Sequence, residues 1–305
     1  MHLIKMKETI AIVGGSGFIG TKLSEVLLEK GYTVRIIDFV PPRVQHERLI
    51  FTKSNLAEGN SSSDLIDGCL AVINLAGATI GRRWNASYKE KIYNSRIDTT
   101  RALVRLIENC VKKPEVLVNA SAVGYYGDRG EDVLGEDSKP GTDFLGKLCV
   151  DWEREASLAD SSGVRVVSIR TANVLGPGGL LTTLEPMFRR WIGGYFGSGT
   201  QYMPWVHWKD IVGIYVHAIE HPLRGAFNVG AGKTPTQKEL FKAFARTVHA
   251  PVVWSVPYVV ARLIFGQFAD ALVASQNTDS KKIREAGYTY QFEDISTALR
   301  ELYPY

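Results

Sequence analysis

The sequence predicts an α/β fold in which helices cover both faces of a parallel, doubly wound sheet. Through the first half of the chain, short apolar runs alternate with helical stretches of about ten or more residues. The runs have no polar face, as is typical of strands buried on both sides. A glycine-rich turn joins the first run to the first helix, and the 305 residues suffice for one large α/β domain with a smaller partner.

The expected elements follow in the order that this fold needs. The strands are Thr9–Val13, Thr33–Asp38, Ala71–Ala76, Glu115–Ala120 and Val164–Ile169; the helices are Phe18–Lys30, Ser87–Cys110 and Thr142–Leu158, the last with acidic residues on its outer face. Gly31 ends the first helix, as C-terminal glycines commonly do. The residues before Thr9 are expected to form a short tail, because their apolar run is only about five residues long.

The pattern changes after Gly176. Glycines and prolines concentrate between Gly176 and Pro204, and helices dominate from Asp210. We therefore expect a sheet domain over residues 1–175. A substrate-side region with a C-terminal helical module should follow over 176–305, and the sheet can take further strands from it. The apolar stretch from Pro257 to Ala274 is expected to be a helix that closes a pocket, forms a dimer or, by default, packs in the core.

Composition excludes several classes of function. The 36 basic and 32 acidic residues are scattered, which leaves no footprint for nucleic acid or an anionic membrane. The stretch 252–274 is a poor membrane span because Arg262, Gln267 and Asp270 interrupt it. Three widely spaced cysteines indicate free buried thiols: Cys69, Cys110 and Cys149. We expect a cytoplasmic monomer or homodimer whose partner is a small-molecule substrate.

The turn after the first strand has the spacing of a dinucleotide-binding loop. Gly14, Gly17 and Gly20 allow a tight turn, close approach of the backbone to a pyrophosphate, and close packing of helix on sheet. The helix N-terminus then meets the phosphates. Asp38 ends the next strand and suits a ribose 2′-hydroxyl, which favours NAD(H). NADP(H) stays open because Arg35 and Arg43 are close in sequence. The sheet domain is therefore expected to be of the Rossmann type.

Several further stretches carry a resemblance to a known family. They are NLAGA (74–78), Arg83-Trp84, SRIDTTRALV from Ser95, NASAVGYYGD (119–128), DFLGKLCVDWEREA (143–156), RTANVLGPGG (170–179), GSGTQYMPWVHWKDIV (197–212), FNVGAG from Phe227, and the tail from Val256 through Ser275-Gln276 to KIREAGYTYQF. With the glycine loop they resemble the extended short-chain dehydrogenase/reductase superfamily, and within it the YfcH-like, SulA-like epimerase family proteins with a short C-terminal module. That branch often has an arginine, suited to NADP, where Asp38-Phe39 stands here.

The resemblance and the loop together imply a set of cofactor-binding residues. These are Gly14, Ser16, Gly17, Phe18, Ile19, Gly20, Asp38, Leu56, Leu75, Ala76, Gly77 and Arg96. The superfamily transfers protons with a Tyr-x-x-x-Lys pair on one helix face. In this sequence no tyrosine has a lysine four positions on; Phe144 and Leu148 stand at the matching place, and Lys147 should point about 100° away.

Other residues are then candidates for the chemistry. Ser121 would polarise a carbonyl, and Tyr125 or Tyr126 would supply a proton if a cation such as Arg96 lowered its pKa; the alternative is that both tyrosines pack the loop. The resemblance also implies that Asn173 contacts substrate.

Trp205 and His207 are expected to line the same cleft. A turn cap for Asn173 and a core position for Trp205 are the alternatives.

A second motif resembles a zinc-binding signature. Residues 217–221 read H-x-x-E-H, the inverted zinc-protease signature, but Pro222 ends the helix at once. Exposed helix histidines are the better interpretation, so we expect no metal. The sequence thus predicts an NAD(P)-dependent enzyme, either epimerase/dehydratase-like on a nucleotide sugar or reducing a small carbonyl compound. The alternative is a non-catalytic redox sensor that binds a protein partner.

Overall fold

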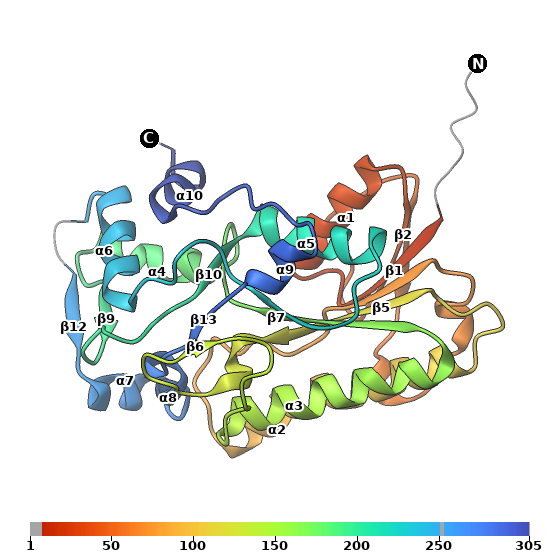
Figure 1. Cartoon of the computed structure of the whole chain (residues 1–305), viewed down its shortest axis with the longest axis horizontal. Coiled ribbons are helices and arrows are strands. Elements are labelled where there is room, and N and C mark those ends of the chain that lie inside the picture. The colour runs from red at the N-terminus through yellow and green to blue at the C-terminus, as the bar shows by residue number, and fades with distance from the viewer. Residues whose placement is uncertain (1–7, 251–252, 305) are drawn as a thin grey trace.

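A seven-stranded parallel sheet forms the centre of the molecule (Figure 1). The computed structural model describes residues 8–250 and 253–304, so most of the expected N-terminal tail lies outside the described residues. The strands are β1 (Thr9–Val13), β2 (Thr33–Asp38), β3 (Leu49–Lys53), β4 (Ala71–Asn74), β5 (Val116–Ala122), β7 (Arg165–Thr171) and β11 (Gly225–Val229). Their order is β11-β7-β5-β4-β1-β2-β3, which reverses direction between β1 and β4. The predicted Rossmann-type fold class is confirmed.

Helices cover both faces of this sheet (Figure 1). One face carries α1 (Phe18–Glu29) and α5 (Trp208–Glu220), and the other carries α2 (Ala86–Glu108) and α3 (Phe144–Ser157). Because side chains alternate along a strand, β1 contributes side chains to the helix layers on both faces of the sheet. Ile10 and Ile12 share an apolar cluster with Leu23 of α1, whereas Val13 shares another with Leu103 of α2.

Two strands of the sheet were not predicted. β3 is an edge strand whose residues are mostly half-buried or exposed, so it lacks a continuous apolar run. β11 lies beyond the expected boundary at residue 175 and pairs with β7, so the sheet does take a strand from the second region. The three cysteines are free and buried, as expected. None of the helices in the described ranges is long and apolar enough to span a membrane.

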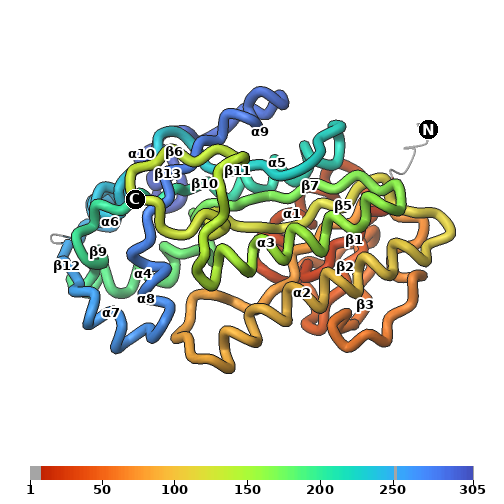
Figure 2. Tube along the Cα trace, turned by 60° about the horizontal axis from the view of Figure 1, so that its bottom comes forward, coloured from red at the N-terminus to blue at the C-terminus, as the bar shows by residue number. Residues whose placement is uncertain are grey.

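Most of the remaining elements gather at one end of the molecule, whereas α9 lies beside the central sheet (Figure 2). Short parallel pairs join β8 (Asn173–Leu175) to β10 (Trp205–His207), β9 (Gly194–Phe196) to β12 (Trp254–Val256), and β6 (Val133–Leu134) to β13 (Asn277–Thr278). The helices are α4 (Leu180–Arg189), α6 (Gln237–Thr247), α7 (Tyr258–Phe265), α8 (Phe268–Val273), α9 (Lys281–Glu285) and α10 (Ile295–Leu302).

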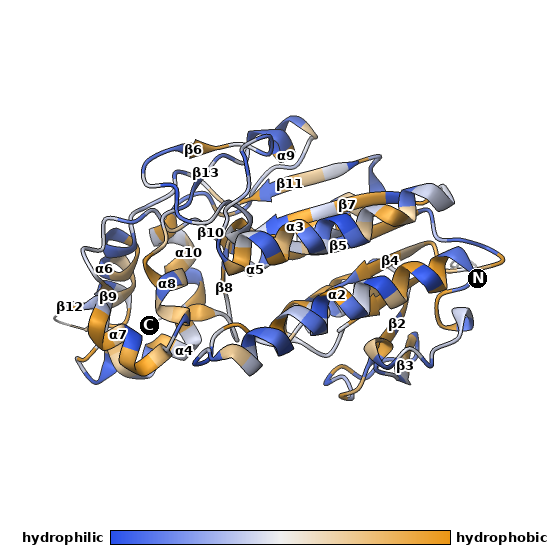
Figure 3. Ribbon diagram, turned by 90° about the horizontal axis from the view of Figure 1, so that it is seen from below, coloured by the Kyte–Doolittle hydropathy of each residue, from blue (hydrophilic) through white to orange (hydrophobic). Residues whose placement is uncertain are grey.

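The stretch from Pro257 to Ala274 is two helices rather than the expected one. Gly266 separates α7 from α8 with a φ of +61°, and a Cβ there would lie 2.4 Å from the Trp84 carbonyl oxygen. Only glycine fits such a position without strain. α7 is apolar on its outward side, where Val259 and Leu263 are 67% and 68% exposed (Figure 3). α8 faces the interior.

Candidate functional site

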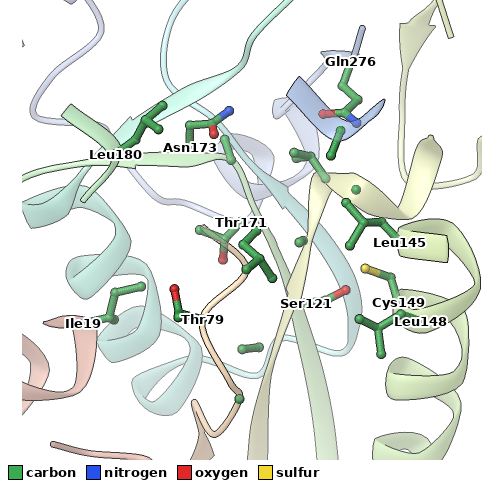
Figure 4. Close-up of a pocket in the computed structure, with 18 of the residues that line it drawn as sticks. Ile19, Thr79, Ser121, Leu145, Leu148, Cys149, Thr171, Asn173, Leu180 and Gln276 are labelled. Atoms are coloured by element: carbon green, nitrogen blue, oxygen red, sulfur yellow. The ribbon is translucent and has the colours of Figure 1, made fainter. Parts of the chain in front are cut away.

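A cavity of about 530 Å³ opens at the carboxyl ends of β1, β4, β5 and β7. It lies where the strand order reverses, which is where open α/β sheets bind ligands. Figure 4 shows Ile19 and Thr79 on one side and Leu145 and Leu148 of α3 on the other, with Ser121 at the end of β5 between them. The glycine loop and α3 therefore lie on opposite sides of the cavity, and residues of the second region such as Leu180 and Phe268 complete its lining.

The three glycines of the loop serve different purposes. A Cβ on Gly14 (φ +76°) would lie 2.8 Å from Cα and N of Ala76, and one on Gly20 would lie 2.6 Å from Cα of Gly15. Packing therefore requires glycine at both positions. A Cβ on Gly17 would meet only the Gly14 carbonyl oxygen, at 3.6 Å. Since Gly17 also lines the cavity, its missing side chain leaves room for a ligand.

The start of α1 is suited to an anion. The helix begins at Phe18 with Gly17 as its N-cap, and within the described residues no side chain caps it and no acid stands in its first turn. Unpaired helix N-terminal amides attract phosphate. Phe18, Ile19 and Gly20 line the cavity beside them. These observations fit the pyrophosphate of a dinucleotide.

Asp38 fastens the glycine loop to the end of β2. Its carboxylate accepts hydrogen bonds from the backbone amides of Ser16 (3.1 Å) and Val40 (3.2 Å), and the Ser16 hydroxyl donates to the Val40 carbonyl (2.5 Å). A carboxylate has about four acceptor sites, so capacity for a ribose hydroxyl remains. Arg35 donates instead to the carbonyls of Asp64 and Leu65, at 3.0 and 2.9 Å. It is therefore not directed at a 2′-phosphate.

The segment after β4 supplies the floor of the cavity. Leu75, Gly77 and Arg96 line it, whereas Ala76 packs against Gly14 and Leu56 is buried away from the lining. Of the expected cofactor residues, most thus line the cavity; those that do not are Ser16, Asp38, Leu56 and Ala76.

Arg96 packs tightly in this floor. Its Nη1 donates to the carbonyls of Ala78 (3.1 Å) and Ile92 (3.2 Å), and a Cβ on Gly77 would lie 2.7 Å from its Cζ. Burial lowers the pKa of Arg96 to about 10.

Ser121 is hydrogen-bonded to a buried ion pair formed by Glu153 and Arg170. Its hydroxyl donates to Oε1 of Glu153 at 2.6 Å, and Arg170 holds both carboxylate oxygens through Nε and Nη2, each at 2.8 Å. The charged side chains are only 5% (Arg170) and 15% (Glu153) exposed. Ser121 lines the cavity, whereas Glu153 lies behind it. Without a ligand, the hydroxyl therefore directs its proton to the carboxylate and its lone pairs toward the cavity, where they suit a ligand hydroxyl; by rotating, it can donate instead to a ligand carbonyl.

The two tyrosines lie outside the cavity lining. Tyr126 is fully buried; its hydroxyl donates to Oδ1 of Asn228 (2.6 Å) and accepts from Nη1 of Arg170 (2.9 Å). The ring of Tyr125 lies 3.5 Å from the Arg170 guanidinium. The expectation that Arg96 lowers the pKa of one of them is wrong for Tyr126, because burial raises its pKa to about 12 and the adjacent cation is Arg170.

The face that α3 presents to the cavity is apolar. Leu145, Leu148, Cys149 and Trp152 line it, at the spacing of one helix face. Of the expected pair, Leu148 lines the cavity, whereas Phe144 packs edge-on against Trp84. One residue along, Leu145 and Cys149 line the cavity at i and i+4. Lys147 is exposed, as its angle predicts. Neither register places a tyrosine or a lysine in the cavity.

The three expected substrate residues separate into two groups. Asn173 lines the cavity while its Nδ2 donates to the Pro204 carbonyl at 2.9 Å. Trp205 and His207 are buried and do not belong to the described lining. Nδ1 of His207 accepts from the Lys209 amide (3.3 Å) at the start of α5, and its Nε2 lies 3.0 Å from Glu301. Trp205 therefore occupies a core position and His207 a capping position, rather than the cleft.

The H-x-x-E-H stretch makes ordinary fold contacts. α5 ends at Glu220, as Pro222 predicts. Nε2 of His217 lies 2.9 Å from the Ala286 carbonyl, and Glu220 pairs with Lys30 at 3.2 Å. His217 is half-buried rather than exposed, and burial lowers its pKa. No group of three or more metal-ligating side chains occurs within the described ranges.

Sequence reasoning missed Glu153 and Arg170, and it left the role of α8 open between three alternatives. We expected the acids of α3 to face outward, but Glu153 points at Arg170 and Glu155 pairs with Arg101 at 3.1 Å. A usable signal was present: an arginine inside the buried run of β7 requires a partner. Phe268, Ala271 and Leu272 of α8 line the cavity, so this part of the expected helix does close the pocket.

Comparison with known proteins agrees with this architecture. Residues 10–230 match the model of the NAD dependent epimerase/dehydratase family, and residues 256–302 match a domain of unknown function, DUF1731. Epimerase family protein Mb2239 of Mycobacterium bovis is 37% identical over 295 residues, covering 95% of this chain and 96% of that protein.

Two solved structures illustrate the likeness of fold. Human epimerase family protein SDR39U1 (isoform 2), solved with NADPH, is 30% identical with a TM-score of 0.85 and covers 96% of this chain and 98% of its own. UDP-N-acetylglucosamine 4-epimerase of Methanobrevibacter ruminantium, in complex with UDP-N-acetylmuramic acid, has a TM-score of 0.81 over 97% of both chains. At 20% identity it is similar in fold alone.

Proposed function

Because this chain belongs to the NAD dependent epimerase/dehydratase family, we propose that it is an NAD(P)-dependent oxidoreductase that interconverts a hydroxyl and a carbonyl group on a small molecule. Ser121 takes the place of the missing tyrosine and lysine. One observation carries the proposal: a hydroxyl held at 2.6 Å by a buried carboxylate lies in the same cavity as the glycine loop.

The glycine loop and the start of α1 hold the dinucleotide. Gly17 gives the pyrophosphate close access to the backbone, and Asp38 accepts the ribose hydroxyl, which favours NAD(H). The NADPH on the human relative keeps NADP(H) as the alternative. When bound, the nicotinamide supplies or accepts the hydride.

The residues of the chain must then move one proton. In the oxidising direction, Oγ of Ser121 accepts the proton of the substrate hydroxyl as its own proton passes to Glu153. In the reducing direction both protons move back, and the substrate oxygen ends as a hydroxyl. Arg170 keeps the carboxylate aimed at Ser121 through its two hydrogen bonds. Glu153 is thus a positioning residue that acts through Ser121.

The test follows the hydride rather than a chosen substrate. The protein is loaded with dinucleotide that carries deuterium at nicotinamide C4 and is incubated with fractionated metabolite extract, and products are searched by mass spectrometry for deuterium. We expect a labelled product with the wild type, and at least about a hundredfold less with Ser121→Ala. Lys147→Ala, an exposed position on α3, is the matched control and should leave the label unchanged.

Two outcomes would contradict the proposal. If Ser121→Ala bound dinucleotide normally and still transferred deuterium at the wild-type rate, Ser121 would not be the proton-transferring group. If the dinucleotide bound but deuterium reached no compound, the chain would be a dinucleotide-binding sensor rather than an enzyme.

A further inference from the structure

The cavity is nearly free of charge. Of the lining residues that the structure describes, Arg96 alone bears a charged side chain, and it packs under Gly77 on the dinucleotide side. The lining residues from the second region, which include Leu180, Gln201, Gln237, Leu272 and Gln276, are all uncharged. A diphosphate placed there would lose its water without meeting a cation, and proteins pair buried phosphates with arginine or lysine.

The second helix N-terminus at the cavity does not replace the missing cations. α4 begins at Leu180, which lines the cavity, and its N-cap is Gly179. The amide of Gly178 donates to the Thr182 hydroxyl at 3.0 Å, and the amide of Gly179 donates to the Gly176 carbonyl at 3.0 Å. These bonds occupy the two amides that precede the helix, and the partial charge at the remaining N-terminal amides of α4 is smaller than the full charge of a lysine or arginine.

The two glutamines are likewise committed to the fold. Gln201 Nε2 donates to Oε1 of Gln237 and to the Phe196 carbonyl, both at 3.0 Å. Gln237 Nε2 donates to the Leu272 carbonyl at 2.9 Å and so fixes the end of α8. Both glutamines are buried. Their role is to hold the wall rather than to bind a sugar ring.

What remains is an apolar slot between two helices. Leu145 and Leu148 of α3 form one wall, and Phe268, Ala271 and Leu272 of α8 form another, at i, i+3 and i+4. Asn173 adds an amide oxygen, since its Nδ2 is bonded to Pro204. Gln276 adds another, since its Nε2 donates to the Gly127 carbonyl at 3.2 Å. Both amides are neutral, as are the hydroxyl groups that Thr79 and Tyr202 add to the lining, so the polar groups of the slot suit an alcohol or a ketone and offer a phosphate no charge.

From these observations we infer that the substrate is a neutral, mainly apolar alcohol or ketone and not a nucleoside diphosphate sugar, and that α8 of the C-terminal module forms its binding wall. This inference rests on the proposed function for the assignment of Ser121, whose hydroxyl meets the oxygen of the substrate. The apolar body then lies against α3 and α8, where burial of apolar surface provides the affinity.

The experiment compares two classes of probe on the full chain by calorimetry and by saturation-transfer NMR. The neutral ketones are cyclohexanone, menthone and decalone, and the anionic probe is UDP-glucose. We expect at least one ketone to bind, with affinity rising with its apolar area, and UDP-glucose to show no saturation up to about 1 mM, the weak end of specific binding. UDP-glucose should also fail to displace the ketone.

Matched variants locate the binding site. Leu272→Asp places a carboxylate in the wall and should weaken ketone binding by about tenfold or more. Leu263→Asp makes the same change on the exposed side of neighbouring α7 and should have no effect. Ala271→Phe, which fills the slot without adding charge, serves if Leu272→Asp does not fold.

Each remaining outcome decides against the inference. Saturable UDP-glucose binding, equal effects of the Leu272 and Leu263 variants, or no binding by any ketone would overturn it. Dinucleotide binding is titrated separately on the same samples. Its absence would contradict the proposed function while leaving the ketone result to stand, so the two failures are distinguishable.

Discussion

Substitution by alanine should affect stability at Gly14 and dinucleotide affinity at Gly17. At Gly14 the left-handed φ of +76° costs about 1–2 kcal/mol for any L residue. The new Cβ would also overlap backbone atoms of Ala76 at 2.8 Å, an overpacking cost of about 1–3 kcal/mol. We therefore expect Gly14→Ala to lower the free energy of unfolding by roughly 2–5 kcal/mol.

At Gly17 the backbone is already compatible with alanine. Its φ is −73°, and the nearest atom to a new Cβ lies 3.6 Å away. A poorer N-cap costs about 0.5–1 kcal/mol, and the stiffer unfolded chain offsets about the same amount. Stability should therefore stay within about 1 kcal/mol of wild type. Dinucleotide affinity should fall at least about tenfold, because the methyl group takes the space for the pyrophosphate.

The assay pairs denaturant unfolding of the unliganded protein with calorimetric titration of NAD(H) and NADP(H). Gly59→Ala is the control, since Gly59 has the same left-handed backbone (φ +75°) with no atom within 4 Å of a new Cβ. The packing argument fails if Gly14→Ala costs no more than Gly59→Ala. The binding argument fails if Gly17→Ala binds dinucleotide like wild type.

Three further perturbations test other parts of the structure. Asp38→Ala should shift the ratio of NADP to NAD affinity toward NADP by about tenfold, since a charge-assisted bond to the ribose contributes about 1.5–3 kcal/mol; an unchanged ratio in paired calorimetric titrations would exclude that role. Arg170→Met should lower the free energy of unfolding, measured with denaturant, by about 3–5 kcal/mol, because Glu153 is left buried without its partner. Adding Glu153→Gln should recover part of this loss, and equal stabilities of the single and double variants would argue against a buried pair. Burial raises the pKa of the Cys149 thiol from about 9 to about 12, so the folded chain holds this proton more tightly than the unfolded chain does. The free energy of unfolding therefore falls as pH rises from about 9 to about 12, and it should fall less in Cys149→Ala. If wild type and variant showed the same dependence of unfolding free energy on pH, the thiol would not be involved.

The strands and helices of the first half followed from local pattern because burial on both faces leaves an unbroken apolar run. β1 and β2 begin and end where the sequence places them. β3 and β11 were not predicted. β3 is an edge strand and only partly buried, and the sequence of β11, GAFNV, includes a glycine and an asparagine that interrupt the apolar run. Asn228 inside β11 is satisfied by the carbonyls of Leu134 and Asp279, far away in sequence. Periodicity cannot reveal such partners.

The cofactor loop was readable from sequence because each glycine has a local reason. Only part of the candidate catalytic group at the end of β5 could be predicted from the sequence. Ser121 could be named, but its partner Glu153 lies 32 residues away and is brought to it by the packing of α3 against the sheet. The α8 wall was harder still, since Gly266 divides an apolar run into one exposed helix and one lining helix through contact with Trp84.

The most direct test of the central claim is a crystal structure of the protein with reduced dinucleotide and the tightest-binding neutral ketone. The account predicts the pyrophosphate over Gly17, the ketone oxygen within hydrogen-bond reach of Ser121 Oγ at about 2.6–3.2 Å, and the apolar body of the ketone against Leu272. A nicotinamide ring distant from Ser121, or a ketone bound outside the slot between α3 and α8, would contradict it.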